Sequence, residues 1–237
     1  MLSRREILAA GASIVVAGAC GVAKRQAAIA PTSKRSAIGP QHLPRWRGFN
    51  LWEKLTPEVD GPYLEWDFDR IAEWGFDFVR LPTDYRIWTS SSGHYRERPL
   101  REIDQAIAWG RARRIHVCLA LAVAPGYGVD ALKLRGPLDA LDLWADGADG
   151  DEARRQFAAQ WRMLAERYRG IDSADLSFNL VNEPPKITGA QYLRTARAAV
   201  DAIRAVDVER LVIADGSSWG REPVGDLVPL AVAQSTR

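Results

Sequence analysis

From Trp46 to the last residue, short apolar runs alternate with amphipathic segments, and this alternation constrains the fold most strongly. The runs are apolar throughout, which is typical of strands buried on both faces of a sheet. Such strands, each followed by an amphipathic helix, form parallel sheets covered by helices. The predicted strands are 46–52, 76–81, 115–123, 176–181 and 211–214, and the predicted helices are 67–74, 100–114, 151–169 and 190–206.

Two architectures share this alternation, an open doubly wound sheet and a closed barrel. A nucleotide-binding open sheet is disfavoured because no glycine-rich phosphate loop follows the first strand. Polar residues stand at the ends of several strands, and barrel enzymes build one cleft from many strand ends. The sequence therefore predicts an α/β fold of the (β/α)8 TIM-barrel type. The polar residues in question are Asn50, Arg80, Asp84, Asn182, Glu183 and Asp215.

Composition sets the class of protein. The chain has 237 residues, 47% of them hydrophobic and 26% charged, which is ordinary for one globular domain. A net charge of +2, with scattered arginines, disfavours nucleic acid as a partner. Most of the nine tryptophans should lie in the core, although indole faces also suit sugar rings. The two cysteines imply no disulfide framework, and the histidines lack ligand-spaced companions, so neither a metal nor a cofactor is expected.

The beginning of the chain resembles an export signal. The segment 3–8 (Ser-Arg-Arg-Glu-Ile-Leu) is similar to a twin-arginine motif, and the apolar run 8–19 is too short to span a bilayer. We expect an export signal at 1–21, a tether at 22–44 and the folded domain at 45–237. Cleavage before Cys20 with lipid attachment would give a lipoprotein, whereas simple cleavage would release the protein. Either route places it outside the cytoplasm, in the periplasm, the cell envelope or the medium.

The segment 176–185 carries the chemistry. Its apolar run stops at Asn182, Glu183 and two prolines, and proline ends a strand because it cannot donate to the sheet. A carboxylate is thus delivered at the carboxyl end of a strand, where barrel active sites are built. In a partly apolar cleft, Glu183 is a candidate general acid/base for cleaving a glycosidic bond, a reaction that needs two carboxylates.

At this point the chain resembles family 5 of the glycoside hydrolases, the cellulase family. The ordered matches are 47–51 (Arg-Gly-Phe-Asn-Leu), 78–82 (Phe-Val-Arg-Leu-Pro), 115–127 with Ala-Pro-Gly-Tyr at its end, 180–184 (Leu-Val-Asn-Glu-Pro), 211–216 with Trp219, and 232–237. Asn-Glu-Pro alone is moderately specific, but several strand motifs in the right order are strong. The resemblance covers about the first two-thirds of the family's barrel, so the fold is expected to stop after about the fifth β/α unit.

The resemblance implies roles for individual residues. Glu183 would protonate the leaving oxygen and later deprotonate water, as in retaining hydrolysis of β-linked sugars. Asn182 would hydrogen-bond the 2-hydroxyl of the sugar, and Arg80 would orient the nucleophilic carboxylate. Candidate substrate-binding residues are Asn50, Trp52, Trp88 and Tyr127, and Trp144 is a further candidate for stacking, although packing is the more usual role of tryptophan. His116, at the far end of its strand, should be structural.

The chain departs from the family pattern in two places. Ala122 and Val123 stand where the family usually has His and often Arg, and a methyl group cannot bind a sugar hydroxyl. The strand that would carry the family's nucleophilic Glu is not in this sequence, and neither Asp84 nor Asp215 occupies that position. We therefore expect a truncated gene model or fragment, inactive or nearly so by itself.

Three functions remain open. The first is hydrolysis of O-glycosidic bonds in a β-linked polysaccharide by a retaining enzyme. The second is a catalytically dead exported carbohydrate-binding protein on a barrel scaffold, which the loss at Ala122 favours slightly. The third is an unrelated secreted α/β protein. In the first two, the partner is a polysaccharide or oligosaccharide.

Overall fold

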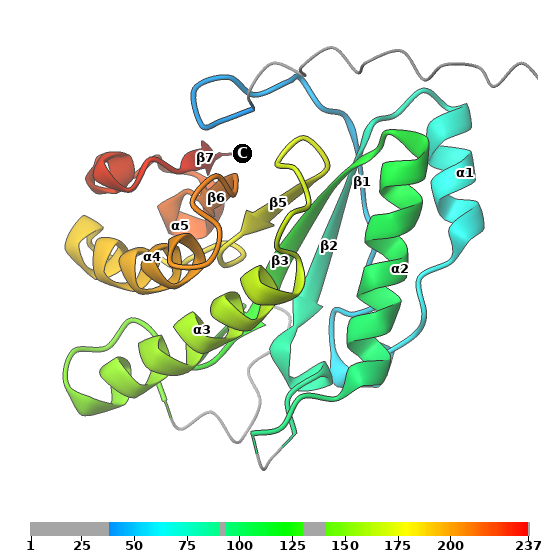
Figure 1. The fold of residues 1–237 in the computed structure, drawn as a ribbon. Coiled ribbons are helices and arrows are strands. Elements are labelled where there is room, and N and C mark those ends of the chain that lie inside the picture. Colours follow the sequence, from blue (N-terminus) through cyan, green and yellow to red (C-terminus); the bar gives the residue numbers. More distant parts are fainter. Residues whose placement is uncertain (1–37, 91–92, 130–140, 237) are drawn as a thin grey trace, which may run out of the picture. The chain divides into compact units, whose positions relative to one another are not determined.

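The computed structural model describes residues 38–90, 93–129 and 141–236. In these ranges, parallel strands are ordered β1-β2-β3-β5-β6-β7 in one sheet, and β4 pairs antiparallel with β3 (Figure 1). The sheet forms a half-barrel, which confirms the predicted α/β class. The strands are β1 (Gly48–Asn50), β2 (Phe78–Asp84), β3 (His116–Ala124), β4 (Tyr127–Gly128), β5 (Leu176–Asn179), β6 (Val212–Asp215) and β7 (Ala233–Ser235).

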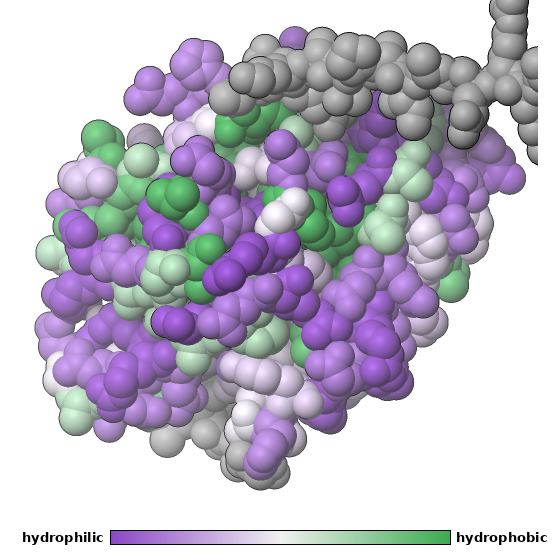
Figure 2. Space-filling view, viewed as in Figure 1, coloured by the Kyte–Doolittle hydropathy of each residue, from purple (hydrophilic) through white to green (hydrophobic). Residues whose placement is uncertain are grey.

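Helices follow the strands as the sequence predicts. In Figure 1, α1 and α2 lie together on one flank, and α3 and α4 lie beside each other toward β5 and β6. The outer surfaces of α2 and α3 are mainly hydrophilic (Figure 2). The helices are α1 (Glu65–Glu73), α2 (Glu97–Arg113), α3 (Ala148–Arg167), α4 (Gly189–Arg204) and α5 (Ser217–Gly220), with short 3-10 turns η1 (Pro57–Val59), η2 (Tyr85–Ile87) and η4 (Gly225–Leu230). Within the described ranges, no helix is long and apolar enough to cross a membrane.

The start of α4 shows how local sequence fixes an element. The backbone amide of Gln191 donates to the Thr188 hydroxyl at 3.2 Å, and the Thr188 amide donates to Gln191 Oε1 at 3.0 Å. These two bonds form the reciprocal capping box that the spacing predicts, and they satisfy amides that would otherwise lack partners. They set the start of α4, the helix that follows the Glu183 segment.

The core lies between the sheet and its helices. Every residue of β3 is buried, as expected of a central parallel strand. In α3, Phe157, Trp161 and Leu164 are fully buried, as expected for the apolar face of the amphipathic helix predicted at 151–169. Burial of each such side chain contributes roughly 1.5–3 kcal/mol to the free energy of unfolding.

β2 continues past its predicted end because of where Pro82 stands. The amide of Leu51 donates to the carbonyl of Arg80, and the amide of Asp84 donates to the carbonyl of Lys54, so alternate residues of β2 face the β1 side. Pro82 lies between them and faces the same side, beyond the last paired residue of β1, Asn50. Its missing N–H therefore breaks no bond in the sheet, and the strand runs on to Asp84.

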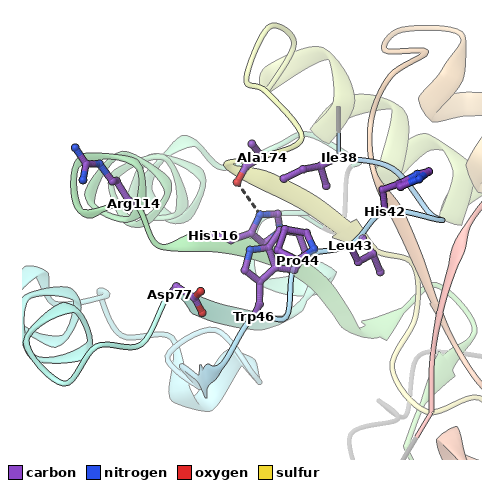
Figure 3. Close-up of a pocket in the computed structure, with 9 residues that line it drawn as sticks. All are labelled: Ile38, His42, Leu43, Pro44, Trp46, Asp77, Arg114, His116 and Ala174. Atoms are coloured by element: carbon purple, nitrogen blue, oxygen red, sulfur yellow. Dashed lines mark hydrogen bonds between the residues drawn. The ribbon is translucent and has the colours of Figure 1, made fainter. Parts of the chain in front are cut away.

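At the amino-terminal ends of the strands, His116 is part of the packing. The Trp46 ring stacks on the His116 ring with centroids 3.7 Å apart, beside a cavity of about 550 Å³ (Figure 3). His116 Nδ1 lies 3.0 Å from the Ala174 carbonyl, and Nε2 lies 2.8 Å from the Ser177 hydroxyl. Burial lowers the pKa of His116 to about 4. These contacts agree with the structural role expected for His116.

Candidate active site

Glu183 lies on the loop that follows β5, at the carboxyl edge of the sheet. It is half-buried, and its backbone has a left-handed φ of 51°. This region disfavours side chains with a Cβ atom, so the surrounding contacts must hold Glu183 in it. Its amide donates to Asp215 Oδ2 at 3.0 Å, and its carbonyl accepts a bond from the Tyr127 hydroxyl at 2.5 Å. Glu183 is therefore held at the edge of the sheet by residues from β6 and β4.

Arg80 joins two asparagines beside this loop. From β2, its Nη2 donates to Asn182 Oδ1 at 2.9 Å and to Asn179 Oδ1 at 2.6 Å, and its Nε donates to Asn179 Oδ1 at 3.0 Å. Hydrogen bonds from a guanidinium are charge-assisted and stronger than those between neutral groups. The structure therefore brings Arg80 together with Asn182 and Glu183, which the sequence placed at the end of a different strand.

Asp215, at the end of β6, is the next member of this cluster. Its Oδ1 accepts from Asn179 Nδ2 at 3.0 Å, and its Oδ2 lies 4.0 Å from Arg80 Nη2. Burial raises the pKa of Asp215, and the nearby Arg80 charge and the Asn179 bond oppose that rise. The sequence suggested that Asp215 could line the cleft, and the structure adds that it holds the Glu183 backbone.

Asn179 was missed by the sequence analysis. It is 1% exposed on β5, yet its side chain contacts both Arg80 and Asp215. A signal was present, because Asn179 interrupts an apolar run and a buried amide needs hydrogen-bond partners. The run 176–181 could therefore have been read as carrying a residue of the site as well as core residues.

A cavity of about 480 Å³ opens beside this cluster. Arg80, Asn179 and Asp215 form its polar wall, and Cys118 also lines it. Burial raises the pKa of the Cys118 thiol to about 11, so that thiol is neutral at ordinary pH. The remaining lining residues are Leu43, Pro44, Arg45, Trp46, Phe78, Ile213, Ala233, Gln234, Ser235 and Thr236.

The residues expected to bind substrate separate into accessible and inaccessible groups. Asn50 is exposed, and Trp52 is 48% exposed. The loop that carries Trp52 is held by buried Lys54, whose ammonium group donates to Asp60 Oδ1 and to the Gly61 carbonyl, both at 2.6 Å. A sugar can reach Asn50 and Trp52, so both stay candidates.

The substrate-binding roles predicted for Trp88 and Tyr127 need correction. Trp88 is fully buried and donates from Nε1 to Gln160 Oε1 at 2.9 Å, so no sugar can stack on it. Tyr127 is 7% exposed, and its hydroxyl is bonded to the Glu183 carbonyl. It supports the Glu183 backbone rather than binding substrate. Trp144, 6% exposed, packs edge-on against Tyr127.

Asp84 and Ala122 also bear on the cleft. Asp84 is fully buried and accepts bonds from the amide and guanidinium of Arg86, so it does not line an open cleft. Ala122 is 1% exposed on β3 and brings no polar atom to that strand end.

Trp219 belongs to the fifth of the sequence matches to the family. Its backbone lies beside the Glu183 loop. Its amide donates to the Pro184 carbonyl at 2.8 Å, and its side chain is 44% exposed. Ser218 and Trp219 both have left-handed backbones, with φ of 54° and 60°. The Trp219 indole is therefore accessible to a large ligand.

Comparisons with known proteins agree with this geometry. Residues 38–231 match the family described as cellulase (glycosyl hydrolase family 5). Endoglucanase C of Acetivibrio thermocellus is 31% identical over 157 residues, which are 65% of this chain and 43% of that enzyme. A probable glucan 1,3-beta-glucosidase A of Emericella nidulans is 33% identical over 123 residues, 51% of this chain and 28% of that protein. The chain thus spans less than half the length of these relatives.

Solved structures give the same picture. A glycoside hydrolase superposes with a TM-score of 0.72 at 35% identity, covering 80% of this chain and 58% of that one. Thermotoga maritima Cel5A, solved with cellobiose, gives a TM-score of 0.59 at 22% identity over 79% of this chain and 55% of that one, a likeness of fold alone. With the family match over residues 38–231, these findings show that the chain belongs to glycosyl hydrolase family 5.

Proposed function

We propose that this chain carries the acid/base side of an active site that hydrolyses O-glycosidic bonds in a β-linked polysaccharide. The observation that carries the proposal is the Glu183 segment, where a carboxylic acid at a strand end stands beside Asn182, Arg80 and Asp215. Family membership supplies the reaction class.

Each residue has a role in the proposed reaction. Glu183 donates its proton to the leaving glycosidic oxygen and then accepts a proton from the water that attacks the sugar. Asn182 bonds the 2-hydroxyl, a contact that strengthens as the transition state forms. Arg80 supplies positive charge near the nucleophilic carboxylate. Asn50, Trp52 and Trp219 provide accessible surface for sugar rings.

We also propose that this polypeptide has little or no activity by itself. Retaining hydrolysis needs a second carboxylate as nucleophile. Asp215 does not stand at the family's nucleophile position, and its oxygens accept instead from Asn179 and from the backbone amide of Glu183. Ala122 stands where the family usually has His, so a further polar contact to the sugar is missing. The same two observations favour the second candidate function, a carbohydrate-binding protein on a barrel scaffold, for which Trp52 and Trp219 would be the accessible indoles.

The proposed location is outside the cytoplasm. It rests on the twin-arginine-like sequence within 1–21, and lipid attachment at Cys20 is one of its two routes. These residues and most of the expected tether lie outside the described part of the chain. Labelling with radioactive palmitate, compared between the natural chain and Cys20→Ala, would detect a lipid anchor.

Release of reducing sugar from β-glucan and β-mannan tests the proposed reaction. The enzyme proposal expects release by the full-length gene product, loss of release in Glu183→Gln, and unchanged release in the matched control Glu73→Gln, whose carboxylate is exposed on α1. Retention on a polysaccharide without release would favour the binding protein. Folded protein without affinity for any glycan would overturn both.

A further inference from the structure

The Glu183 loop adopts a conformation that its own sequence does not favour. Glu183 has φ of 51°, where the side chain of an L residue crowds its own backbone. Such a residue stays in place only where its surroundings over-determine it. The contacts around the loop therefore decide where the Glu183 carboxyl group points.

Neighbouring elements supply a hydrogen bond at each step of this loop. The Asn182 amide donates to the Leu121 carbonyl of β3 at 2.9 Å, and the Pro184 carbonyl accepts from Trp219. Between them, the Glu183 amide donates to Asp215 Oδ2, and its carbonyl accepts from the Tyr127 hydroxyl. The two peptide groups on either side of the Glu183 Cα atom are therefore each held by a side chain.

Tyr127 and Asp215 are joined to each other behind the loop. The Tyr127 ring packs edge-on against Trp144, with centroids 5.4 Å apart, and Trp144 packs edge-on against Tyr192 at 5.7 Å. The Tyr192 hydroxyl then donates to the Asp215 carbonyl at 2.6 Å. All three rings are at most 7% exposed. This aromatic bracket, defined by Tyr127, Trp144 and Tyr192, connects the two groups that hold Glu183.

We propose that Tyr127 and Asp215 are positioning residues that fix the left-handed backbone of Glu183 and so aim its carboxyl group. The inference rests on the proposed acid/base role of Glu183. Tyr127 acts through its hydroxyl group and Asp215 through a carboxylate oxygen. Neither contacts the sugar or the reacting atoms in this role.

Nuclear magnetic resonance on the full chain tests the positioning directly. Removing a charged acceptor from the Glu183 amide in Asp215→Ala should speed its hydrogen exchange at least about tenfold. Asp215→Asn retains an acceptor oxygen and should restore much of the protection. Tyr127→Phe should shift the Glu183 carbonyl resonance, and both Asp215→Ala and Tyr127→Phe should move the titration midpoint of the Glu183 carboxyl group. Tyr95→Phe and Asp201→Ala, at exposed positions, should change none of these signals.

The outcomes separate this inference from the proposed function. Unchanged Glu183 exchange and titration in folded Asp215→Ala and Tyr127→Phe overturn positioning, whether or not sugar is released. Equal acceleration at Glu183 and at β3 amides such as Leu119 also overturns it, because that result means general loosening. The expected signals without any glycan hydrolysis or binding leave the positioning intact and reject the proposed function. In a form that hydrolyses glycans, Tyr127→Phe should lower kcat by about 10- to 100-fold with KM nearly unchanged.

Discussion

Arg80 and Asn182 meet through a hydrogen bond from the guanidinium Nη2 to the asparagine Oδ1, 2.9 Å long. Because the carbonyl oxygen of the amide faces a cation, its NH₂ group is directed away from Arg80. Asn182 therefore presents a donor to a bound sugar, and Arg80 decides which end of the amide that sugar meets.

This orientation predicts how Asn182 contributes to binding. The natural chain should bind a cello-oligosaccharide about tenfold more tightly than an analogue lacking the 2-hydroxyl, the value of a typical hydrogen bond. Asn182→Ala should bind both ligands equally, as measured by titration calorimetry. Gln156→Ala, at an exposed position on α3, should keep the tenfold difference. A difference that persists in Asn182→Ala would contradict the assigned contact.

The backbone at Glu183 predicts an unusual stability order. Glycine accepts a φ of 51° without strain, so Glu183→Gly should unfold with a free energy about 1 kcal/mol higher than Glu183→Ala. Urea unfolding measures both variants. At Glu152, a half-buried residue within α3, the order should reverse by about 1 kcal/mol because alanine is the better helix former. If the alanine variant has the higher free energy of unfolding at both sites, the backbone of Glu183 is unstrained.

Two tryptophans first considered together should behave differently. Trp88 is fully buried and bonded to Gln160, so Trp88→Ala should lower the free energy of unfolding by about 3–5 kcal/mol. Trp52 is half-exposed, so Trp52→Ala should change that free energy by about 0.5 kcal/mol or less while weakening glycan binding. Urea unfolding and affinity electrophoresis on β-glucan distinguish the two. A large loss of stability in Trp52→Ala would show that Trp52 serves packing rather than glycan binding.

The burial of His116 predicts a pH dependence of stability. Its pKa is about 4 in the folded protein and about 6.5 in an unfolded chain, so the unfolded state binds the extra proton between these values. The contribution of neutral His116 is therefore fully present above about pH 6.5 and is lost as pH falls toward 4, a change on the order of 3 kcal/mol.

Unfolding in urea at several pH values measures this contribution. The natural chain should lose more stability than His116→Gln between pH 7 and 4, because the glutamine side chain does not titrate. His94→Gln, at an exposed position, should follow the natural chain. Parallel curves for the natural chain and His116→Gln would show that the pKa of His116 is not lowered on folding.

The sequence predicted the strands and helices well because apolar runs and amphipathic stripes report burial directly. It placed the residues that bear chemistry, Glu183, Asn182 and Arg80, at strand ends, which the parallel sheet then brings together. It could not assign Trp88 or Tyr127, because an aromatic side chain suits either a core or a sugar. Only tertiary contacts distinguish these cases, here the bond of Trp88 to Gln160 and that of Tyr127 to Glu183. Pro82 shows the same limit, since its tolerance depends on where β1 ends.

The hydrogen bonds of the Glu183 loop also bear on how the protein folds. Its partners Leu121 and Asp215 are far from Glu183 in the sequence and belong to separate strands, β3 and β6. Contacts between distant residues form late, because long loops must close before those contacts stabilise the chain. We therefore expect Glu183 to be fixed in its left-handed conformation only once β6 has joined the sheet. During synthesis, the candidate acid Glu183 therefore leaves the ribosome before Asp215, the residue that holds its backbone amide.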